Sequence, residues 1–264
     1  MRKIVVVVFG SEKQAASLLD AGAFLLDAVG GGLLHALVIR VPPLATILPS
    51  EEVLTGQREA ELRAEQQRWA AGLKRAVDAW SPQRARPDWI DIEGDGAAIV
   101  REHGERADAV VIGRRAAHEP AWVHERLHAA LFDTGRPTLV VPPGTARGLG
   151  EVVAIAWQDD PRATKAVLAA LPILNRARRV CVLCADGPAT MPAVLAEHDI
   201  SAELHSVPDA PQPLGERLLG AAHGIGADLI VMGAFSHAPW RELLFGGVTR
   251  SMLATADLPL LMMH

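Results

Sequence analysis

A glycine-bearing segment near the end of the chain carries the residue types best suited to holding a ligand. It reads GAFSHAPWRELLFGGVTRSML, from Gly233 to Leu253, and lies between the apolar runs ADLIVM and LPLLMM. This order is typical of a strand, a loop, a helix and a further strand. Backbone N–H groups at the start of such a helix can hold a phosphate group or another anion. The segment therefore predicts an anion site, with a tightly packed helix–strand junction as the alternative.

A second motif, His124-Glu-Arg-Leu-His128, matches the H-E-x-x-H pattern of zinc peptidases. Residues four apart on a helix share one face, so both histidines could bind one zinc ion. A catalytic zinc site needs a third protein ligand, and the nearest acidic residue beyond the following strand is Glu151, in a linker. We therefore favour a solvent-exposed helix face, and we predict neither a metal site nor catalytic residues.

The two cysteines of the chain form a C-x-x-C pattern, Cys181-Val-Leu-Cys184. A redox pair needs its sulfur atoms close together, usually at the start of a helix. This pair lies in an apolar run typical of a strand, where residues three apart point to opposite faces. The prediction is two buried cysteines that act as small apolar residues.

The elements that would position these residues occur twice. Ala107–Gly113 (ADAVVIG) matches Ala227–Gly233 (ADLIVMG), and the Pro/Gly-rich stretch 141–151 separates the two copies. Apolar runs alternate with helical patterns, which is typical of a parallel sheet with right-handed crossovers. The sequence therefore predicts an α/β fold with two tandem doubly wound, Rossmann-like domains, residues 1–143 and 151–264. Each domain is expected to contain a five-stranded parallel sheet.

The expected strands follow from the apolar runs. They lie near residues 3–9, 33–40, 88–92, 108–113 and 137–142 in the first copy, and 151–157, 179–185, 201–207, 228–233 and 258–263 in the second. The last strand of each copy would be an exposed edge. We therefore expect strands 138–141 and 258–263 to pair across a pseudo-twofold axis, giving an intramolecular pseudo-dimer.

One long helix distinguishes the first copy. The stretch 51–80, rich in Glu, Arg, Gln and Ala, has a short counterpart near residues 190–198. It predicts a helix with one apolar stripe and a charged outer face. That face is either solvated or a docking surface for a protein partner or a second subunit, which leaves a homodimer open.

The chain resembles a tandem universal stress protein over essentially its full length. The resemblance rests on MGAFSHAPWRELLFGGVTRSML followed by LPLLMMH, and on the segments LHAALFDTGRPTLVVP and ALPILNRARRVCVL. It implies a stress-response module that senses a nucleotide or works through protein contacts. The alternatives are a slow nucleotide hydrolase and a scaffold without a small ligand. The loop lacks the lysine of a P-loop, which lowers the hydrolase alternative.

In nucleotide-binding members of that family, the loop reads Gly, two residues, Gly, nine residues, Gly, and then Ser or Thr. The second copy matches two of these four positions, with Ser236 and Gly247 as the departures. The family's nucleoside-binding Asp corresponds to Gln158. The resemblance thus implies that ATP or AMP binds weakly or not at all. The implied site consists of Gln158, Gly233, Ser236, His237, Gly246, Gly247, Val248 and Thr249.

The first copy departs further from the family's pattern. Phe9 or Gly10 stands in place of the nucleoside-binding Asp. Alignment on the following strand places His124 and Glu125 where the second copy has Gly246 and Gly247. The first copy is therefore not expected to bind ATP in the family's manner.

Composition excludes several classes of protein. A formal net charge of −5 argues against a nucleic-acid or anionic-membrane binder. The first apolar run, MRKIVVVVF, is too short for a signal peptide, and no apolar stretch is long enough to span a bilayer. Two cysteines indicate no disulfide framework. We therefore expect a soluble, cytoplasmic protein.

Overall fold

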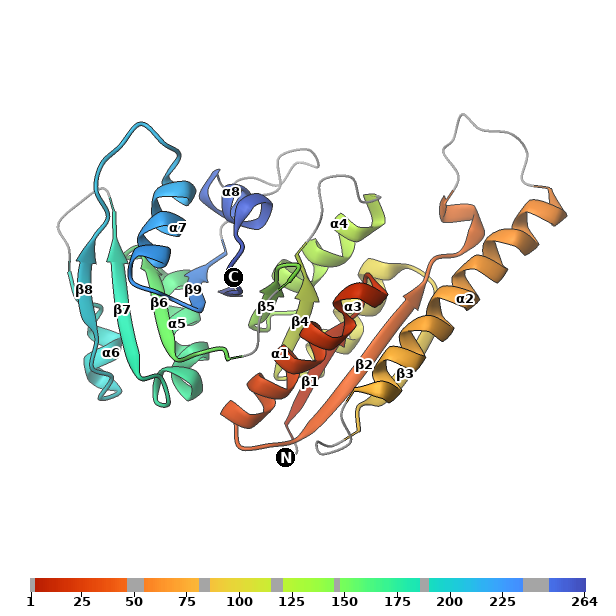
Figure 1. Cartoon of the computed structure of the whole chain (residues 1–264), viewed down its shortest axis with the longest axis horizontal. Helices are drawn as coiled ribbons and strands as arrows, with labels where there is room; N and C mark the ends of the chain where they lie inside the picture. Colours follow the sequence, from red (N-terminus) through yellow and green to blue (C-terminus); the bar gives the residue numbers. More distant parts are fainter. Residues whose placement is uncertain are drawn as a thin grey trace.

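A computed structural model (Figure 1) describes residues 3–46, 55–80, 86–114, 121–144, 148–185, 190–234 and 247–264. We call residues 3–144 the first half and residues 148–264 the second half. The strands of the first half are β1 (Ile4–Val8), β2 (Leu33–Arg40), β3 (Asp88–Glu93), β4 (Ala109–Gly113) and β5 (Thr138–Val141). Its helices are α1 (Ala15–Ala28), α2 (Gly56–Ala79), α3 (Gly96–Glu105) and α4 (Ala121–His128), and a π-helical turn, Ala129–Asp133, continues α4.

The second half repeats this order. Its strands are β6 (Val152–Trp157), β7 (Arg179–Cys184), β8 (Glu203–Ser206), β9 (Leu229–Gly233) and β10 (Leu260–Met263). Its helices are α5 (Pro161–Leu174), α6 (Ala193–Glu197), α7 (Leu214–Gly224) and α8 (Gly247–Thr255). The expected α/β fold is confirmed, and helix 51–80 is confirmed over residues 56–79. The domain boundaries 1–143 and 151–264 stay predictions.

All ten strands of the described residues form one sheet, in the order β3-β2-β1-β4-β5-β10-β9-β6-β7-β8. Within each half the strands are parallel, as predicted. The halves meet where β5 and β10 pair antiparallel, with Leu260 opposite Val140 and Met262 opposite Thr138. The expected pairing of the last strands is thus confirmed, and two potential edge strands become interior strands.

Proline sets where both of these joining strands begin. β5 starts directly after Pro137 and β10 directly after Pro259. Proline has no N–H to donate to a ladder, so it is tolerated at the first position of a strand but not within one. This explains why β10 begins at Leu260 and not at the expected residue 258.

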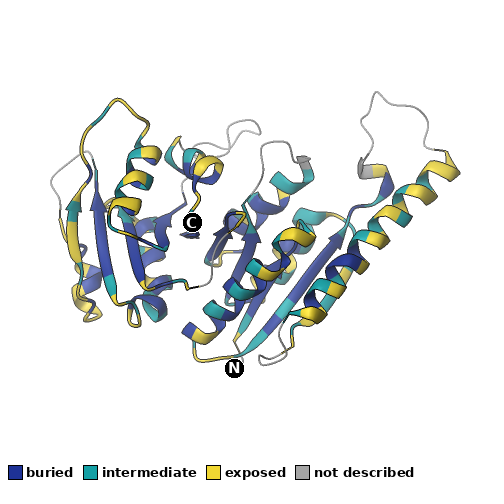
Figure 2. Ribbon diagram, in the orientation of Figure 1, coloured by how far each residue is buried: buried dark blue, intermediate teal, exposed yellow. Residues whose placement is uncertain are grey.

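Two helical layers cover the sheet and bury both of its faces (Figure 2). Helices α1, α2, α5 and α6 pack on one face, and α3, α4, α7 and α8 pack on the other. Each layer contributes to one apolar core that runs through both halves. The first core includes Leu18, Leu73, Val167 and Leu195, and the second includes Val100, Leu127, Leu218 and Met252. Continuously apolar strands such as β1 (IVVVV) follow from this double cover.

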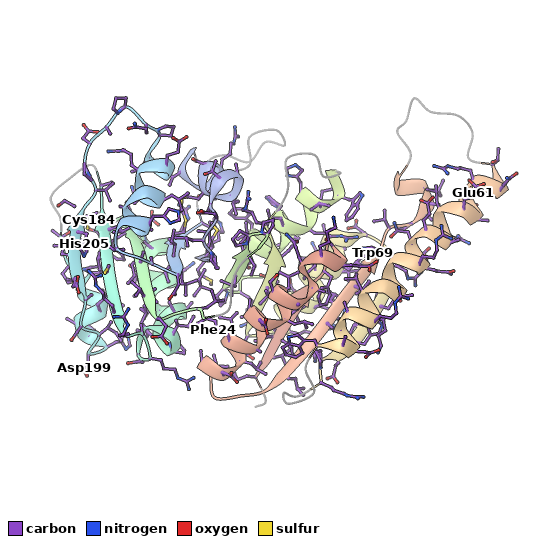
Figure 3. The ribbon with its side chains drawn as sticks, viewed as in Figure 1. Phe24, Glu61, Trp69, Cys184, Asp199 and His205 are labelled. Carbon is purple, nitrogen blue, oxygen red and sulfur yellow. The ribbon has the colours of Figure 1, made fainter. Side chains whose placement is uncertain are left out.

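Helix α2 is the largest difference between the halves. Its own residues Ala70, Leu73 and Val77 are buried on the face that packs on the sheet, while most of its charged residues are exposed. Figure 3 shows Glu61 of this helix at the opposite end of the molecule from Cys184 and His205. The counterpart α6 spans five residues. No helix of the described residues is long and apolar enough to cross a membrane.

Candidate functional site

In the second half, the end of β9 lies against the first turn of α5. A Cβ atom at Gly233, the last residue of β9, would lie 3.0 Å from the Ala163 backbone N and 3.1 Å from the Arg162 carbonyl carbon. Glycine therefore allows the end of β9 to approach the first turn of α5. Because β9 and β6 are neighbours in a parallel sheet, this junction is the switch point where α/β folds hold ligands.

The loop between β6 and α5 presents a neutral amide, Gln158, and two carboxylates, of which Asp159 is exposed and Asp160 caps α5. Gln158 follows β6 and is exposed. The Asp160 carboxylate caps α5, accepting a hydrogen bond from the Arg162 N–H at 2.7 Å. The Arg162 guanidinium lies 3.9 Å from the same carboxylate. Gln158 therefore contributes a neutral amide, and Asp160 is engaged within its own turn.

His264, which follows β10, and Lys165 on α5 lie at the same edge of the sheet. The His264 Nδ1 donates a hydrogen bond to the Ala234 carbonyl oxygen at 3.0 Å, so Nδ1 carries the proton. The Lys165 Nζ donates to the His264 carbonyl oxygen at 3.5 Å. The sequence analysis missed both residues. The signal that could have found His264 is its position directly after β10, whose last residue, Met263, is the register partner of Gly233.

At the start of α8, the first residue is exposed and the third is buried. Gly247 is exposed, and a Cβ atom added there would meet no atom of the described residues within 4 Å. Val248 is half-buried, and the Thr249 side chain is fully buried. Ser236, His237 and Gly246 lie outside the described residues. Of the predicted site, the structure thus brings together the ends of β6 and β9 and leaves the backbone at Gly247 accessible.

At the corresponding edge of the first half, an apolar side chain ends the first strand. Phe9, at the end of β1, is fully buried, and Glu125 on α4 is exposed. The His128 ring packs on Phe132 with 4.9 Å between the ring centroids, and its Nδ1 lies 3.8 Å from the Asp133 carboxylate. Among the described residues, neither His124 nor His128 joins a group of three ligand-type side chains.

Arg126, the middle residue of that H-E-x-x-H motif, is buried, with an exposed fraction of 3%. Its Nη2 donates to the Ile39 carbonyl oxygen at 2.9 Å, near the end of β2. Its guanidinium lies 4.3 Å from the centre of the Trp122 ring. Within the part of the chain that the structure describes, its Nε and Nη1 atoms have no hydrogen-bond partner. Burial lowers the pKa of Arg126 to about 10, against the opposing effect of Glu125.

Arg126 reaches this position because a glycine makes room for it. A Cβ atom at Gly96, the first residue of α3, would lie 2.4 Å from the Arg126 Nε. The guanidinium therefore fills the space between the start of α3 and the end of β2. Sequence reasoning missed this arginine, since its neighbours on α4 suggested a solvated face.

The two cysteines behave as the sequence predicts. Cys181 and Cys184 are buried free thiols on β7. Cys184 packs in the core beneath α5 and α6, whereas Cys181 faces the other side of the sheet. The predicted separation of the two sulfur atoms is thus confirmed, and they are not placed as a redox pair.

Comparison with known proteins shows which family the second half resembles. Residues 211–264, from the loop before α7 to the end of β10, match the model of the Universal stress protein family. A comparison of the sequence with curated proteins gives no match. The expected resemblance to universal stress proteins is confirmed in this region.

Solved structures extend the likeness in fold to nearly the whole chain. One is a universal stress protein from Archaeoglobus fulgidus DSM 4304, with a TM-score of 0.71 and 14% identity over 98% of this chain and 95% of that chain. Another is a functionally unknown protein from Pseudomonas aeruginosa PAO1, with a TM-score of 0.59 and 14% identity over 99% of this chain and 92% of that chain. At this level of identity the comparison establishes a shared fold.

Proposed function

We propose that this chain is a non-enzymatic stress-response module built from two tandem units of the universal stress protein type. Its second half would bind a phosphate-bearing nucleotide, ATP or AMP, weakly at a partly retained site. The match of residues 211–264 to the family model carries the proposal, because this segment contains β9, the following loop and α8. The repeated strand order of the two halves supports the tandem arrangement.

The geometry of the second half supports an anion as the ligand. Gly233 keeps the end of β9 close to α5, and the exposed backbone at Gly247 begins α8, where N–H groups point out of the helix. Lys165 on α5 adds positive charge at this edge of the sheet, whereas the charge of Arg162 is offset by its pairing with Asp160. A phosphate group fits this combination better than a cation or a neutral ligand.

The same residues argue for weak binding. Gln158 stands where a carboxylate would accept hydrogen bonds from ribose hydroxyl groups, and Asp160 is engaged with Arg162. Ser236 and Gly247 are two further departures in the loop. Each lost hydrogen bond costs about 0.5–1.5 kcal/mol. Two or three such losses weaken binding roughly 10- to 1,000-fold.

The test is thermal unfolding of the full chain with and without millimolar Mg-ATP, AMP or inorganic phosphate. A ligand at 100 times its dissociation constant stabilises the folded state by about 2.7 kcal/mol. We expect a stabilisation below about 1 kcal/mol for millimolar ATP, which corresponds to a dissociation constant near the ligand concentration. Gly247→Val, whose side chain would cover the backbone N–H groups at the start of α8 without touching another described residue, should remove the effect.

Gly220→Val is the matched control, since Gly220 is also exposed and also has no atom within 4 Å of an added Cβ. It should leave the ATP effect unchanged. ATP that copurifies with the protein would contradict weak binding. No stabilisation by any of the three ligands would leave a scaffold that acts through protein contacts, with the charged face of α2 as the candidate surface. Steady release of phosphate from ATP would contradict the non-enzymatic assignment.

A further inference from the structure

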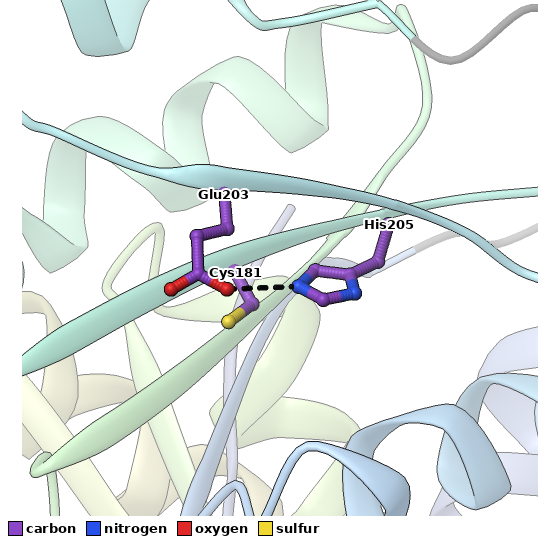
Figure 4. A group of neighbouring side chains, drawn as sticks. All are labelled: Cys181, Glu203 and His205. Atoms are coloured by element: carbon purple, nitrogen blue, oxygen red, sulfur yellow. Dashed lines mark hydrogen bonds and ion pairs between the residues drawn. The ribbon is translucent and has the colours of Figure 1, made fainter.

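Three side chains with the chemistry of metal ligands meet near the outer edge of the second half. Cys181 lies on β7, and Glu203 and His205 lie on β8, the last strand of the sheet. One ligand atom from each residue lies within 4.8 Å of the others (Figure 4). This group lies on the strands themselves, two strands away from the β9 loop of the proposed nucleotide site.

Strand register places the three side chains on one face. In the parallel pair β7–β8, Cys181 is the partner of Glu203, and Leu183 is the partner of His205. Side chains that face each other across neighbouring strands lie on the same side of the sheet, and residues two apart along a strand share a face. The arrangement is therefore fixed by backbone hydrogen bonds and does not depend on a flexible loop.

We propose that Cys181, Glu203 and His205 form a binding site for a zinc-like divalent cation. A thiolate, an imidazole and a carboxylate are the ligand types that zinc accepts, and three protein ligands leave a fourth position for water. Ligand atoms that share a tetrahedral zinc ion lie roughly 3.5 Å apart. The Glu203 and His205 ligand atoms are already 3.2 Å apart. Only the separations from the Cys181 sulfur, which are at most 4.8 Å, need to shorten by about 1 Å, and side-chain rotation of the two residues on the edge strand allows this.

The hydrogen bonds of the group show where the cation would sit. The His205 Nε2 lies 3.2 Å from a Glu203 carboxylate oxygen, so a proton on Nε2 bridges the two groups. A cation can replace this proton if the proton moves to Nδ1, which keeps the imidazole neutral. The Cys181 thiol is buried and must lose its proton as the cation binds, so binding releases about one proton per ion.

Arg179 orients one ligand, Glu203, and also lowers the affinity of the site for a cation. Its Nε and Nη2 donate to the two Glu203 carboxylate oxygens at 2.9 and 2.5 Å. These two hydrogen bonds hold the Glu203 carboxylate in a fixed orientation beside Cys181. A carboxylate has four acceptor positions, and Arg179 leaves others open. The positive guanidinium also repels a cation, which indicates a modest affinity.

Cobalt provides a direct test, because a Co²⁺–thiolate bond gives a charge-transfer absorption band and a tetrahedral site gives intense visible bands. We expect the chelator-treated full chain to show both on titration with Co²⁺, and added Zn²⁺ to remove them with release of Co²⁺. Cys181→Ser should abolish the charge-transfer band. His205→Gln and Glu203→Gln should weaken Co²⁺ binding roughly tenfold or more.

Cys184→Ser is the matched control, since Cys184 lies on the same strand but faces the opposite core. It should leave the cobalt spectrum unchanged. Thermal unfolding of each metal-free variant shows whether it is folded, and His205→Gln, on the partly exposed strand, gives a test even if Cys181→Ser is unstable. The proposal is overturned if the wild-type chain shows no charge-transfer band, or if Cys184→Ser removes it as completely as Cys181→Ser does.

Discussion

The two halves share the same order of strands and helices, but side chains of different chemistry occupy corresponding positions. In each half, a glycine in the first turn of one helix lies close to the helix that precedes the last strand. Gly96 approaches the Arg126 side chain, whereas Gly215 approaches Ser251, where an added Cβ would lie 2.7 Å from the hydroxyl oxygen. The first half therefore buries a cation where the second half has a small neutral side chain. Repetition of a fold preserves the packing of elements more strictly than the chemistry at their ends.

The carboxylates that anchor the first strand of each half also differ in their surroundings. Asp228 accepts hydrogen bonds from the N–H groups of Gly150, Glu151 and Val152 at 2.6, 3.0 and 3.0 Å. Asp108 accepts from the Ile4 N–H at 2.8 Å and from the Lys3 Nζ at 3.0 Å. Asp228 thus fixes the start of the second half directly after the linker, whereas half of the contacts of Asp108 come from an exposed lysine.

Replacing these two carboxylates should give the largest difference between the halves. Asp228→Ala leaves three backbone donors without their acceptor and should cost about 3 kcal/mol. Asp108→Ala loses one backbone donor and one exposed ion pair and should cost about 1 kcal/mol. Denaturant unfolding of both variants measures the difference. Equal losses would show that the linker contacts of Asp228 add nothing to stability.

A second comparison uses the glycines that end β4 and β9. Gly233→Ala places a Cβ against the backbone of α5 and should cost about 2 kcal/mol, because the backbone cannot move aside. Gly113→Ala places a Cβ 2.5 Å from the end of the Gln14 side chain, which can rotate away. Its cost should stay below about 0.5 kcal/mol. Thermal unfolding of the pair distinguishes a required close approach from an incidental one, and a larger loss at Gly113 would reverse this interpretation.

A third comparison concerns the buried cation of the first half. The lowering of the pKa of Arg126 to about 10 corresponds to a cost of roughly 3 kcal/mol for burying the charge. Arg126→Met removes this cost but loses one hydrogen bond and the contact with Trp122, worth about 1 kcal/mol each. We expect a net gain in stability of about 1 kcal/mol.

The exposed Arg101→Met on α3 is the control for this variant and should change stability by less than about 0.5 kcal/mol. Destabilisation by Arg126→Met would mean that the guanidinium is better satisfied than its contacts with Ile39 and Trp122 indicate.

Features set by local pattern could be predicted from the sequence, and features set by contacts between distant elements could not. Continuous apolar runs predict the central strands, and the repeat predicts that β5 and β10 would otherwise be exposed edges. The burial of Arg126 depends on Gly96, which lies 30 residues earlier and on another helix. The group on β7 and β8 depends on a strand register that neither strand specifies alone.

The smallest expected effect is a pH dependence of opposite sign in the two halves. Burial raises the pKa of Asp108, but the hydrogen bonds from the Ile4 N–H and from Lys3 outweigh it, so the pKa lies below its ordinary value of 3.8. Burial raises the pKa of Asp228 above 3.8 despite its three N–H donors. A carboxyl group with a lowered pKa stabilises the fold above pH 3.8, and this contribution is lost as the pH falls through the lowered pKa. A group with a raised pKa contributes most when it is protonated, and that contribution is lost as the pH rises above 3.8.

Asparagine variants of Asp108 and Asp228 should reveal the opposite pH dependences of their contributions to stability. We compare the free energy of unfolding of the wild type with that of each variant. On acidification from pH 6 to about pH 3, the stability advantage of the wild type over Asp108→Asn should shrink, and its stability advantage over Asp228→Asn should grow. Solvent exposure should keep each change below about 1 kcal/mol. Urea unfolding of the wild type and both variants at several pH values measures these differences. Because the three proteins share every other titrating group, a common acid response cancels in the comparison. If the wild type loses its stability advantage over both variants on acidification, the donors around Asp228 outweigh its burial. The two anchoring carboxylates are then electrostatically alike.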